Sequence, residues 1–301
     1  MAHLLITGGT GFIGQRLCKL ALDAGYRISV FSRRPAQQVS RICGAGVAVI
    51  GELGQIPHLP AIDAVINLAG EPIMDGRWST ARKHVLRNSR IDFTRHLLDA
   101  LSSCSPRPRA LINGSAIGYY GDCGDKECIE TSRAGTGFAA QLCHDWEAEA
   151  QTAGALGMRV CRVRIGVVLD RDGGALQRML PAFRLGAGGT LGSGRQWFSW
   201  IHRDDLCHLI LHLLQREECC GAFNGSTSHP VRNAEFTRAL AHQLHRPAML
   251  KTPAAALKLL LGESASLLLD SQRVIPAATL ASGFEFQYPE LPMALDAILT
   301  K

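Results

Sequence analysis

The sequence predicts an α/β fold built on a doubly wound parallel sheet, followed by a smaller C-terminal domain. Over residues 1–169, short apolar segments typical of buried strands alternate with amphipathic segments typical of helices. The first apolar segment runs directly into a glycine-rich turn, TGGTGFIG, which opens a helix. After residue 170 the alternation gives way to glycine-rich stretches and the aromatic run WFSW. Strands that alternate with helices form parallel sheets with right-handed crossovers.

The glycine turn predicts a dinucleotide-binding site of the Rossmann type. Gly8, Gly11 and Gly14 follow the strand at residues 4–6 in the spacing G-x-x-G-x-x-G. Glycines at these positions permit a tight turn, let a pyrophosphate approach the backbone, and allow close packing of helix on strand. The amides and the positive dipole end of the new helix face that phosphate. The alternative is a glycine turn in an α/β protein that binds no ligand.

The end of the second strand, residues 27–32, indicates which dinucleotide is bound. NAD-selective sites place Asp or Glu about 20 residues past the glycines, where it accepts hydrogen bonds from the adenosine ribose. This chain has Ser32, Arg33 and Arg34 instead. A guanidinium suits a phosphate by its charge and fork geometry, so we expect NADP(H) as the cofactor. The alternative is a solvated arginine pair at a strand end.

The rest of the first domain continues the same alternation. We therefore expect residues 1–169 to form an NADP(H)-binding domain of the Rossmann type. Its remaining elements are expected at residues 46–50 (strand), 64–70 (strand), 79–104 (helix), 110–116 (strand), 137–156 (helix) and 159–169 (strand).

Residues 170–301 are expected to form mostly a substrate-binding domain that covers the carboxyl ends of the strands, where ligands of such folds bind. The motif IHRDDL opens a predicted helix that continues to residue 215, and Asp204 and Asp205 are expected to cap it. Further helices are predicted at residues 233–245 and 254–261. The sequence leaves open that some of these C-terminal segments form part of the Rossmann sheet.

The composition of the 301-residue chain narrows the classes of function. The net charge is +6, but the arginines are scattered and no nucleic-acid motif is present, so we expect no nucleic-acid partner. No apolar run reaches the roughly 18 residues of a membrane span, and no signal peptide precedes the first strand. We therefore expect a cytoplasmic protein without a membrane partner. The ten cysteines include no C-x-x-C pair, which favours buried reduced thiols over a metal site.

Several short motifs together carry a family resemblance. TGGTGFIG, NLAG, SAIGYYG, RIGVVL and WIHRDDL occur in this order, accompanied by GEP, RW, NSR, MLPAFRLGAGG, GSGRQ and LASGFEFQYPEL. The chain resembles the extended short-chain dehydrogenase/reductases, and within them an atypical branch of the NAD(P)-dependent epimerase family with a DUF1731-like C-terminus. The resemblance covers nearly the whole length. It implies an NADP(H)-dependent oxidoreductase or epimerase-like enzyme that acts on a small carbonyl or hydroxyl compound, such as a nucleotide sugar.

The resemblance also implies which residues contact NADP(H). Residues of the glycine turn would border the pyrophosphate, Ser32 and Arg33 would hold the adenosine phosphate, and the residues after the fourth strand would follow the adenosine side. Two roles stay open for Glu71, an acid/base or a ribose contact. From the motif and the resemblance together, the expected cofactor residues are Gly8, Thr10, Gly11, Phe12, Ile13, Gly14, Ser32, Arg33, Arg34, Leu68, Ala69, Gly70, Glu71, Arg90 and Val168.

The usual catalytic pair of the superfamily is missing. By the resemblance, active members use a Tyr-x-x-x-Lys pair on the helix after the fifth strand, together with a Ser or Thr on that strand. Alignment of the helix puts Ala139 and Cys143 at the Tyr and Lys positions, and neither can transfer the proton. Ser115 lies at or one residue before the Ser/Thr position. Tyr119 and Tyr120 follow it within the same turn and are the candidate substitutes.

Four further residues are candidates for the substrate site. Arg164 would anchor an anionic substrate or be a paired arginine at a strand end. In GSGRQWFSW, Arg195 would grip a phosphate and Trp197 would stack on a ring, or the loop would pack the two domains together. His202 would line the crevice or be structural.

Lys83 is the nearest base that could activate a tyrosine, and the alternative is an exposed helix lysine.

Two functions of different class therefore stay open. The first is an oxidoreductase that passes hydride between the nicotinamide and a small-molecule substrate under the C-terminal segments. The second is an NADPH-binding sensor or regulatory protein that has lost turnover, as the missing Tyr-Lys pair would allow. We expect no metal, and either a monomer or a homodimer.

Overall fold

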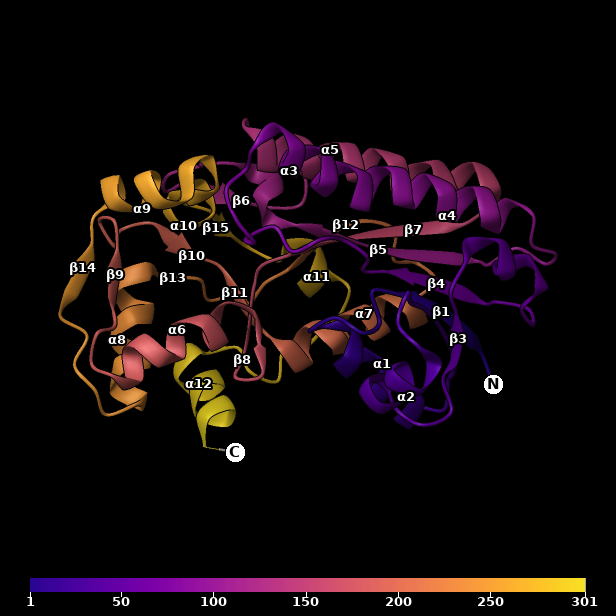
Figure 1. Cartoon of the computed structure of the whole chain (residues 1–301), viewed down its shortest axis with the longest axis horizontal. Coiled ribbons are helices and arrows are strands. Elements are labelled where there is room, and N and C mark those ends of the chain that lie inside the picture. The colour runs from indigo at the N-terminus through magenta and orange to yellow at the C-terminus, as the bar shows by residue number, and fades with distance from the viewer. Residues whose placement is uncertain (301) are drawn as a thin grey trace.

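The computed structural model describes residues 1–300, and its larger part is built on a seven-stranded sheet in which every strand is parallel to its neighbours (Figure 1). The predicted fold class, a doubly wound Rossmann-type sheet, is confirmed. In sheet order the strands are β12 (Gly221–Gly225), β7 (Arg159–Ile165), β5 (Ala110–Ala116), β4 (Ala64–Asn67), β1 (His3–Thr7), β2 (Arg27–Phe31) and β3 (Ala48–Ile50).

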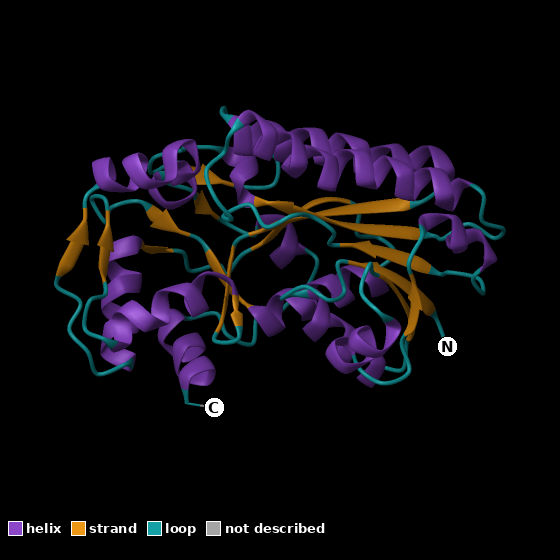
Figure 2. Ribbon diagram, viewed as in Figure 1, coloured by secondary structure: helices purple, strands orange, loops and turns teal. Residues whose placement is uncertain are grey.

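Helices cover both faces of this sheet, as Figures 1 and 2 show. Leu4 and Ile6 of β1 pack with α1, α2 and α7, whereas Leu5 packs with α4 and α5 on the opposite face. Because both faces are covered, β1 is buried along its whole length and reads as a continuous apolar run. The helices of the first face are α1 (Gly14–Asp23), α2 (Ala36–Cys43) and α7 (Arg203–Gln215), and those of the second are α3 (Thr80–Arg87), α4 (Phe93–Ser102) and α5 (Phe138–Gln151).

The long helix predicted at residues 79–104 is α3 and α4 joined by a π-helical stretch, Asn88–Asp92. The Ser79 side chain accepts a hydrogen bond from the Arg82 amide and caps the helix start. π-Helical stretches widen a helix locally and often occur at functional sites. Here the stretch carries Arg90, one of the predicted cofactor residues.

The single strand predicted at residues 159–169 is two strands in the structure. β7 stays in the large sheet, and after Gly166 the chain continues as β8 (Val167–Asp170), which pairs with β11 (Trp200–His202). A Cβ on Gly166 would lie 2.8 Å from the carbonyl oxygen of Ser199, so the chain passes another backbone too closely for any larger residue. The sequence pattern missed this break because both halves are apolar.

Most segments after β8 form a smaller part at the left of Figure 1. Its core contains the fully buried Trp200 with apolar side chains from α6, α8 and α12. The later segments α7, β12 and α11 instead pack in the larger part. The remaining elements are α6 (Gly174–Arg184), α8 (Asn233–Gln243), α9 (Ala254–Leu261), α10 (Ser266–Leu269), α11 (Ala277–Ala281), α12 (Leu291–Leu299), β6 (Glu127–Cys128), β9 (Gly189–Leu191), β10 (Trp197–Phe198), β13 (Val231–Arg232), β14 (Leu250–Thr252) and β15 (Arg273–Val274).

Two further sequence expectations can be compared with the structure. Across residues 1–300, none of the helices combines the length and the apolar character that crossing a membrane requires. All ten cysteines are free thiols, and seven of them are buried, as the spacing analysis predicts.

Candidate functional site

The carboxyl ends of three adjacent strands gather most of the predicted cofactor residues at one edge of the sheet. β4, β1 and β2 lie side by side in this order. The glycine turn follows β1, Ser32 to Arg34 follow β2, and Leu68 to Glu71 follow β4. Because the three strands are parallel, all three loops leave from the same edge. Ligands of doubly wound sheets bind outside this edge.

The glycine turn has the geometry that a diphosphate site needs. Gly8 has φ +68°, and a Cβ there would lie 2.5 Å from the carbonyl oxygen of Leu68. A Cβ on Gly14 would lie 2.2 Å from the carbonyl oxygen of Gly8, so α1 starts directly against the turn. Within the described part of the chain, the backbone amides of Phe12 and Ile13 donate to no acceptor. Such unpaired amides at a helix start are the donors that bind phosphate.

Phe12 and Val168 both approach Gly174, the first residue of α6. A Cβ on Gly173 would lie 2.2 Å from the Phe12 ring, so the ring packs on the backbone of that loop. The Val168 carbonyl oxygen lies close to Gly174, and Val168 itself is buried. The structure thus brings Val168 beside the glycine turn, and its contact with a cofactor stays a prediction.

The residues after β2 differ in their exposure. Ser32 is buried, and its hydroxyl accepts a hydrogen bond of 3.1 Å from the Arg34 amide. The Arg33 side chain is 88% exposed, and one of its guanidinium nitrogens lies 3.6 Å from a Glu71 carboxylate oxygen. This exposure leaves the Arg33 guanidinium open to a phosphate ligand.

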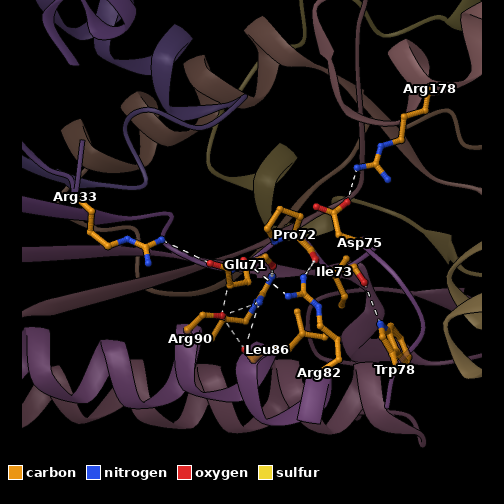
Figure 3. Close-up of polar contacts among 11 residues, drawn as sticks. Arg33, Glu71, Pro72, Ile73, Asp75, Trp78, Arg82, Leu86, Arg90 and Arg178 are labelled. Atoms are coloured by element: carbon orange, nitrogen blue, oxygen red, sulfur yellow. Dashed lines mark hydrogen bonds and ion pairs between the residues drawn. The ribbon is translucent and has the colours of Figure 1, made fainter. Parts of the chain in front are cut away.

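Figure 3 shows how the segment after β4 is held. The Glu71 amide donates to the Ser89 hydroxyl at 3.1 Å, and Arg90 donates to the Glu71 carbonyl oxygen at 3.0 Å. Burial lowers the pKa of Arg90, whose guanidinium carbon lies 5.4 Å from the centre of the Trp146 ring. A Cβ on Gly70 would lie 3.0 Å from the same guanidinium carbon. In this structure Arg90 therefore fixes the shape of the loop that carries the predicted cofactor residues.

Arg82 belongs to this site, although the sequence analysis does not identify it. One guanidinium nitrogen of Arg82 lies 3.9 Å from a Glu71 carboxylate oxygen, and another donates to the Pro72 carbonyl oxygen at 2.5 Å. The Arg82 Nε is buried and has no partner within the described residues. The Glu71 carboxylate thus lies between Arg33 and Arg82 (Figure 3). No sequence pattern separates Arg82 from the other basic residues of α3.

Ser115, one of the catalytic candidates, is part of a buried ion-pair cluster. Its hydroxyl donates to Glu147 Oε1 at 2.7 Å. Arg164 donates to both carboxylate oxygens of Glu147, at 2.8 and 2.9 Å. Burial opposes the charge of Arg164, but Glu147 outweighs it and raises the pKa of Arg164. Of the two alternatives for Arg164, the structure has the paired arginine, and contact with a substrate stays a prediction.

The two candidate tyrosines lie in different environments. Tyr120 is 2% exposed, donates to Asn224 Oδ1 at 2.6 Å and accepts from Arg164 at 3.1 Å. Burial raises the pKa of the Tyr120 phenol well above its ordinary value. Tyr119 is half-buried, and the guanidinium carbon of Arg164 lies 3.5 Å from the centre of its ring. Among residues 1–300, no group forms a hydrogen bond with the Tyr119 hydroxyl, which makes Tyr119 the more available of the two.

The helix positions that would hold the Tyr-Lys pair are covered by the turn after β5. A Cβ on Gly118 would lie 3.4 Å from the Ala139 side chain and 3.9 Å from the Cys143 sulfur. Cys143 is buried, and this burial raises the pKa of its thiol to about 11. Lys83 is paired with Glu263 at 2.5 Å. The expected positions of the proton-transfer pair thus carry a methyl group and a buried thiol.

The predicted substrate residues Arg195 and Trp197 lie in the smaller part of the molecule. The Trp197 ring has the Arg232 guanidinium 3.9 Å and the Arg273 guanidinium 4.9 Å from its centre. Its indole N–H donates to Asp125 at 3.1 Å. Arg195 is exposed. Two arginines of this chain therefore lie against the Trp197 indole, which the sequence predicts to stack on a substrate ring.

His202 is buried at the start of α7 and caps that helix. Its Nδ1 accepts a hydrogen bond of 3.1 Å from the Asp204 amide. The expectation that the two aspartates cap α7 is therefore wrong, because both lie in the first turn, after the capping residue, and their side chains bind other groups. Asp204 is paired with Arg16, and Asp205 accepts from the amides of Gln287 and Tyr288.

Two cavities lie beside these residues. One of 680 Å³ is bounded by the loop that carries Arg195 and by α9 and α10, and its lining includes Asp122, Gln196, Lys258 and Asp270. Burial, and then the charge of Asp122, raises the pKa of Asp270. The second, of 350 Å³, lies between α1, α7 and α12, and His202 is part of its lining. Of the four candidate substrate residues, His202 alone is in the lining of either of these two cavities, so neither cavity gathers the candidates.

Comparison with known proteins finds two family matches along the chain. Residues 4–224 match the NAD dependent epimerase/dehydratase family, and residues 252–298 match a domain of unknown function, DUF1731. A chloroplastic homolog of epimerase family protein SDR39U1 from Arabidopsis thaliana is 41% identical over 299 residues, covering 98% of this chain and 86% of that protein. The SDR39U1 protein of Mus musculus is 40% identical over 302 residues, covering 99% of each.

A solved structure extends the similarity to three dimensions. The crystal structure of human epimerase family protein SDR39U1 (isoform 2) with NADPH superposes with a TM-score of 0.91 at 36% identity, covering 99% of both chains. The family resemblance of the sequence motifs is confirmed, including the DUF1731 segment at the C-terminal end. The chain belongs to the NAD dependent epimerase/dehydratase family.

Proposed function

We propose that this protein binds NADP(H) along the carboxyl edge of β4, β1 and β2. The observation that carries the proposal is the position of Arg33 beside the glycine turn, with no carboxylate at the end of β2. The crystal structure of the human relative with NADPH supports the same cofactor. The turn fits a diphosphate, because a side chain at Gly8 or Gly14 would collide with backbone and the amides of Phe12 and Ile13 are unpaired.

Different residues of this chain would bind different parts of the cofactor. The amides from Thr10 to Ile13 would hold the pyrophosphate, and Ser32, Arg33 and Arg34 would hold the adenosine phosphate. The loop after β4 would support the adenosine side through backbone and shape, and Arg90 fixes that loop. Val168 would border the cofactor from the side of β8.

We further propose that the protein is an oxidoreductase or epimerase-like enzyme acting on a small carbonyl or hydroxyl compound, such as a nucleotide sugar. NADP(H), when bound, would supply or accept a hydride. Of the three catalytic candidates, Tyr119 is best suited to move the accompanying proton, because Ser115 and Tyr120 are committed to buried partners. Arg164 would act by holding the Tyr119 ring in place.

A specific observation favours a second function, an NADPH-binding sensor or regulatory protein without turnover. The positions of the usual Tyr-Lys pair are Ala139 and Cys143, and the backbone at Gly118 packs against both. Neither side chain can act as a lysine-activated tyrosine. In that case the protein would act by binding the cofactor, without converting a substrate.

Titration with NADPH tests the shared premise. A ligand that binds only the folded state stabilises it by about 2.7 kcal/mol at 100 times its Kd, so we expect a clear rise in Tm. An unchanged Tm and unchanged intrinsic fluorescence would exclude the cofactor. NADPH consumption with a panel of carbonyl compounds and nucleotide sugars then separates the two functions. Turnover lost in Tyr119→Phe supports the enzyme, and tight binding without turnover supports the sensor.

The domain division, the cellular compartment and the oligomeric state are further proposals. Residues 1–169 are assigned to cofactor binding and residues 170–301 mainly to the substrate, with α7, β12 and α11 as segments that pack in the larger part. Seven buried free thiols fit a reducing compartment such as the cytoplasm. A monomer or a homodimer is expected, which sedimentation of the purified protein would distinguish.

A further inference from the structure

An ion pair crosses the carboxyl end of β1. Arg33 follows β2 and Glu71 follows β4, and these strands are the two neighbours of β1 in the sheet. Their backbones are separated by two strand spacings, roughly 10 Å. The side chains of Arg33 and Glu71 span this separation, with 3.6 Å between guanidinium nitrogen and carboxylate oxygen. A carboxylate from the loop after β4 therefore lies beside the guanidinium that the residues after β2 supply.

Several contacts keep this carboxylate in place. The backbone of Glu71 is held on both sides, because its amide donates to Ser89 and its carbonyl oxygen accepts from Arg90. On the far side from Arg33, Arg82 lies 3.9 Å from the carboxylate and is itself anchored on the Pro72 carbonyl oxygen (Figure 3). The Glu71 side chain nevertheless stays 34% exposed, so a ligand at this edge can reach it.

We propose that Glu71 sets the balance between NADPH and NADH by limiting the preference for NADPH. This inference rests on the proposed cofactor site. An adenosine phosphate bound to Arg33 would meet the negative charge of Glu71, which repels it and competes for the same guanidinium. The ribose of NADH carries a hydroxyl there instead, and a hydroxyl can donate a hydrogen bond to a carboxylate. Glu71 therefore weakens the binding of NADPH and strengthens the binding of NADH.

The opposite role makes an opposite prediction. If Glu71 served only to orient Arg33 toward the phosphate, its loss would weaken NADPH and leave NADH unchanged. If it served only to shape the loop, its loss would weaken both cofactors equally. The ratio of the two dissociation constants therefore distinguishes the three roles.

The test is to measure the Kd of NADPH and of NADH for the wild-type protein and for Glu71→Gln at one ionic strength. Glutamine keeps the size of the side chain and removes its charge. We expect the ratio Kd(NADH)/Kd(NADPH) to rise about twofold to fivefold, the range for a partly exposed charge. The rise should shrink at high salt, because screening weakens the repulsion. An unchanged or lower ratio in Glu71→Gln overturns the proposal, and Glu71→Ala must shift the ratio in the same direction.

Asp75→Asn is the matched control. Asp75 lies on the same segment and pairs with the Arg178 side chain of α6 at 2.6 Å, on the side of the segment away from Arg33 (Figure 3). We expect this variant to leave the ratio unchanged, and a ratio that rises equally in both variants would assign the effect to the segment rather than to Glu71. Wild-type protein that binds neither nucleotide would refute the cofactor site itself. Wild-type binding with an unaltered ratio in Glu71→Gln would refute only the role of Glu71.

Discussion

Arg33 is the residue on which cofactor choice depends most directly. Its side chain is 88% exposed, and within residues 1–300 the loose ion pair with Glu71 is the one contact that it would lose when a phosphate binds. We expect Arg33→Ala to weaken NADPH about tenfold or more, because hydrogen bonds to charged groups contribute about 1.5–3 kcal/mol, and to change NADH binding little. Fluorescence titration with both nucleotides measures this. Equal losses for NADPH and NADH would refute the adenosine-phosphate role.

At the residue scale, the sequence predicts the groups near the glycine turn better than their partners. Ser32 and Arg33 are identified because they follow a strand at a fixed distance from the glycines. Arg82 could not be identified, because only the path of the segment after β4 brings its guanidinium to Glu71. Tyr119 and Tyr120 are adjacent in sequence, yet only the packing shows that one hydroxyl is used internally and the other is not.

At the element scale, the cluster of Ser115, Glu147 and Arg164 ties together β5, α5 and β7. We expect Glu147→Gln to lower the free energy of unfolding by about 3–5 kcal/mol, because it leaves the buried Arg164 without its counter-charge. Urea denaturation at pH 7 measures the loss. Asp145→Asn, on the same helix but in a more exposed pair with Arg87, should cost less than about 1 kcal/mol. Equal losses of unfolding free energy in the two variants would show that the buried pair contributes no more to stability than the exposed pair.

The elements themselves were mostly predictable, and the exceptions have local causes. The strand at residues 110–116 and the helix at residues 254–261 have the predicted bounds. The strand at residues 159–169 does not, because Gly166 lets the second half leave the large sheet and pair with β11. Hydrophobic periodicity reports burial and not the sheet in which a strand is buried.

At the scale of the whole molecule, Arg16 and Asp204 join the first helix to a helix far along the chain. Arg16 donates to both carboxylate oxygens of Asp204 at 2.8 Å, and this contact packs α1 against α7. Burial opposes ionisation of Asp204, but the hydrogen bonds and charge of Arg16 outweigh it and lower the pKa of Asp204. Since the unfolded value is near 3.9, the pair's stabilisation is complete above about pH 5 and is lost as the pH falls through the folded pKa.

We therefore expect Asp204→Asn to lower the stability by about 1 kcal/mol at pH 7, a modest figure because the pair is partly exposed to solvent. The difference in Tm between wild type and variant should shrink as the pH falls below 5 and vanish once Asp204 of the wild type is protonated in the folded state. Thermal unfolding followed by circular dichroism from pH 7 downward measures this. A difference that persisted unchanged at low pH would assign the effect to packing rather than to charge.

The sequence by itself determined the fold class, the family and the edge of the sheet at which a dinucleotide would bind. These follow from patterns that are local in the chain, namely apolar periodicity, glycine spacing and the residues that end a strand. The tertiary structure decided which charges meet: Glu147 with Arg164, Glu71 with Arg33 and Arg82, and Arg16 with Asp204. Each of these pairs joins residues from different elements, and the order and packing of parallel strands, which no short stretch of sequence encodes, bring them together.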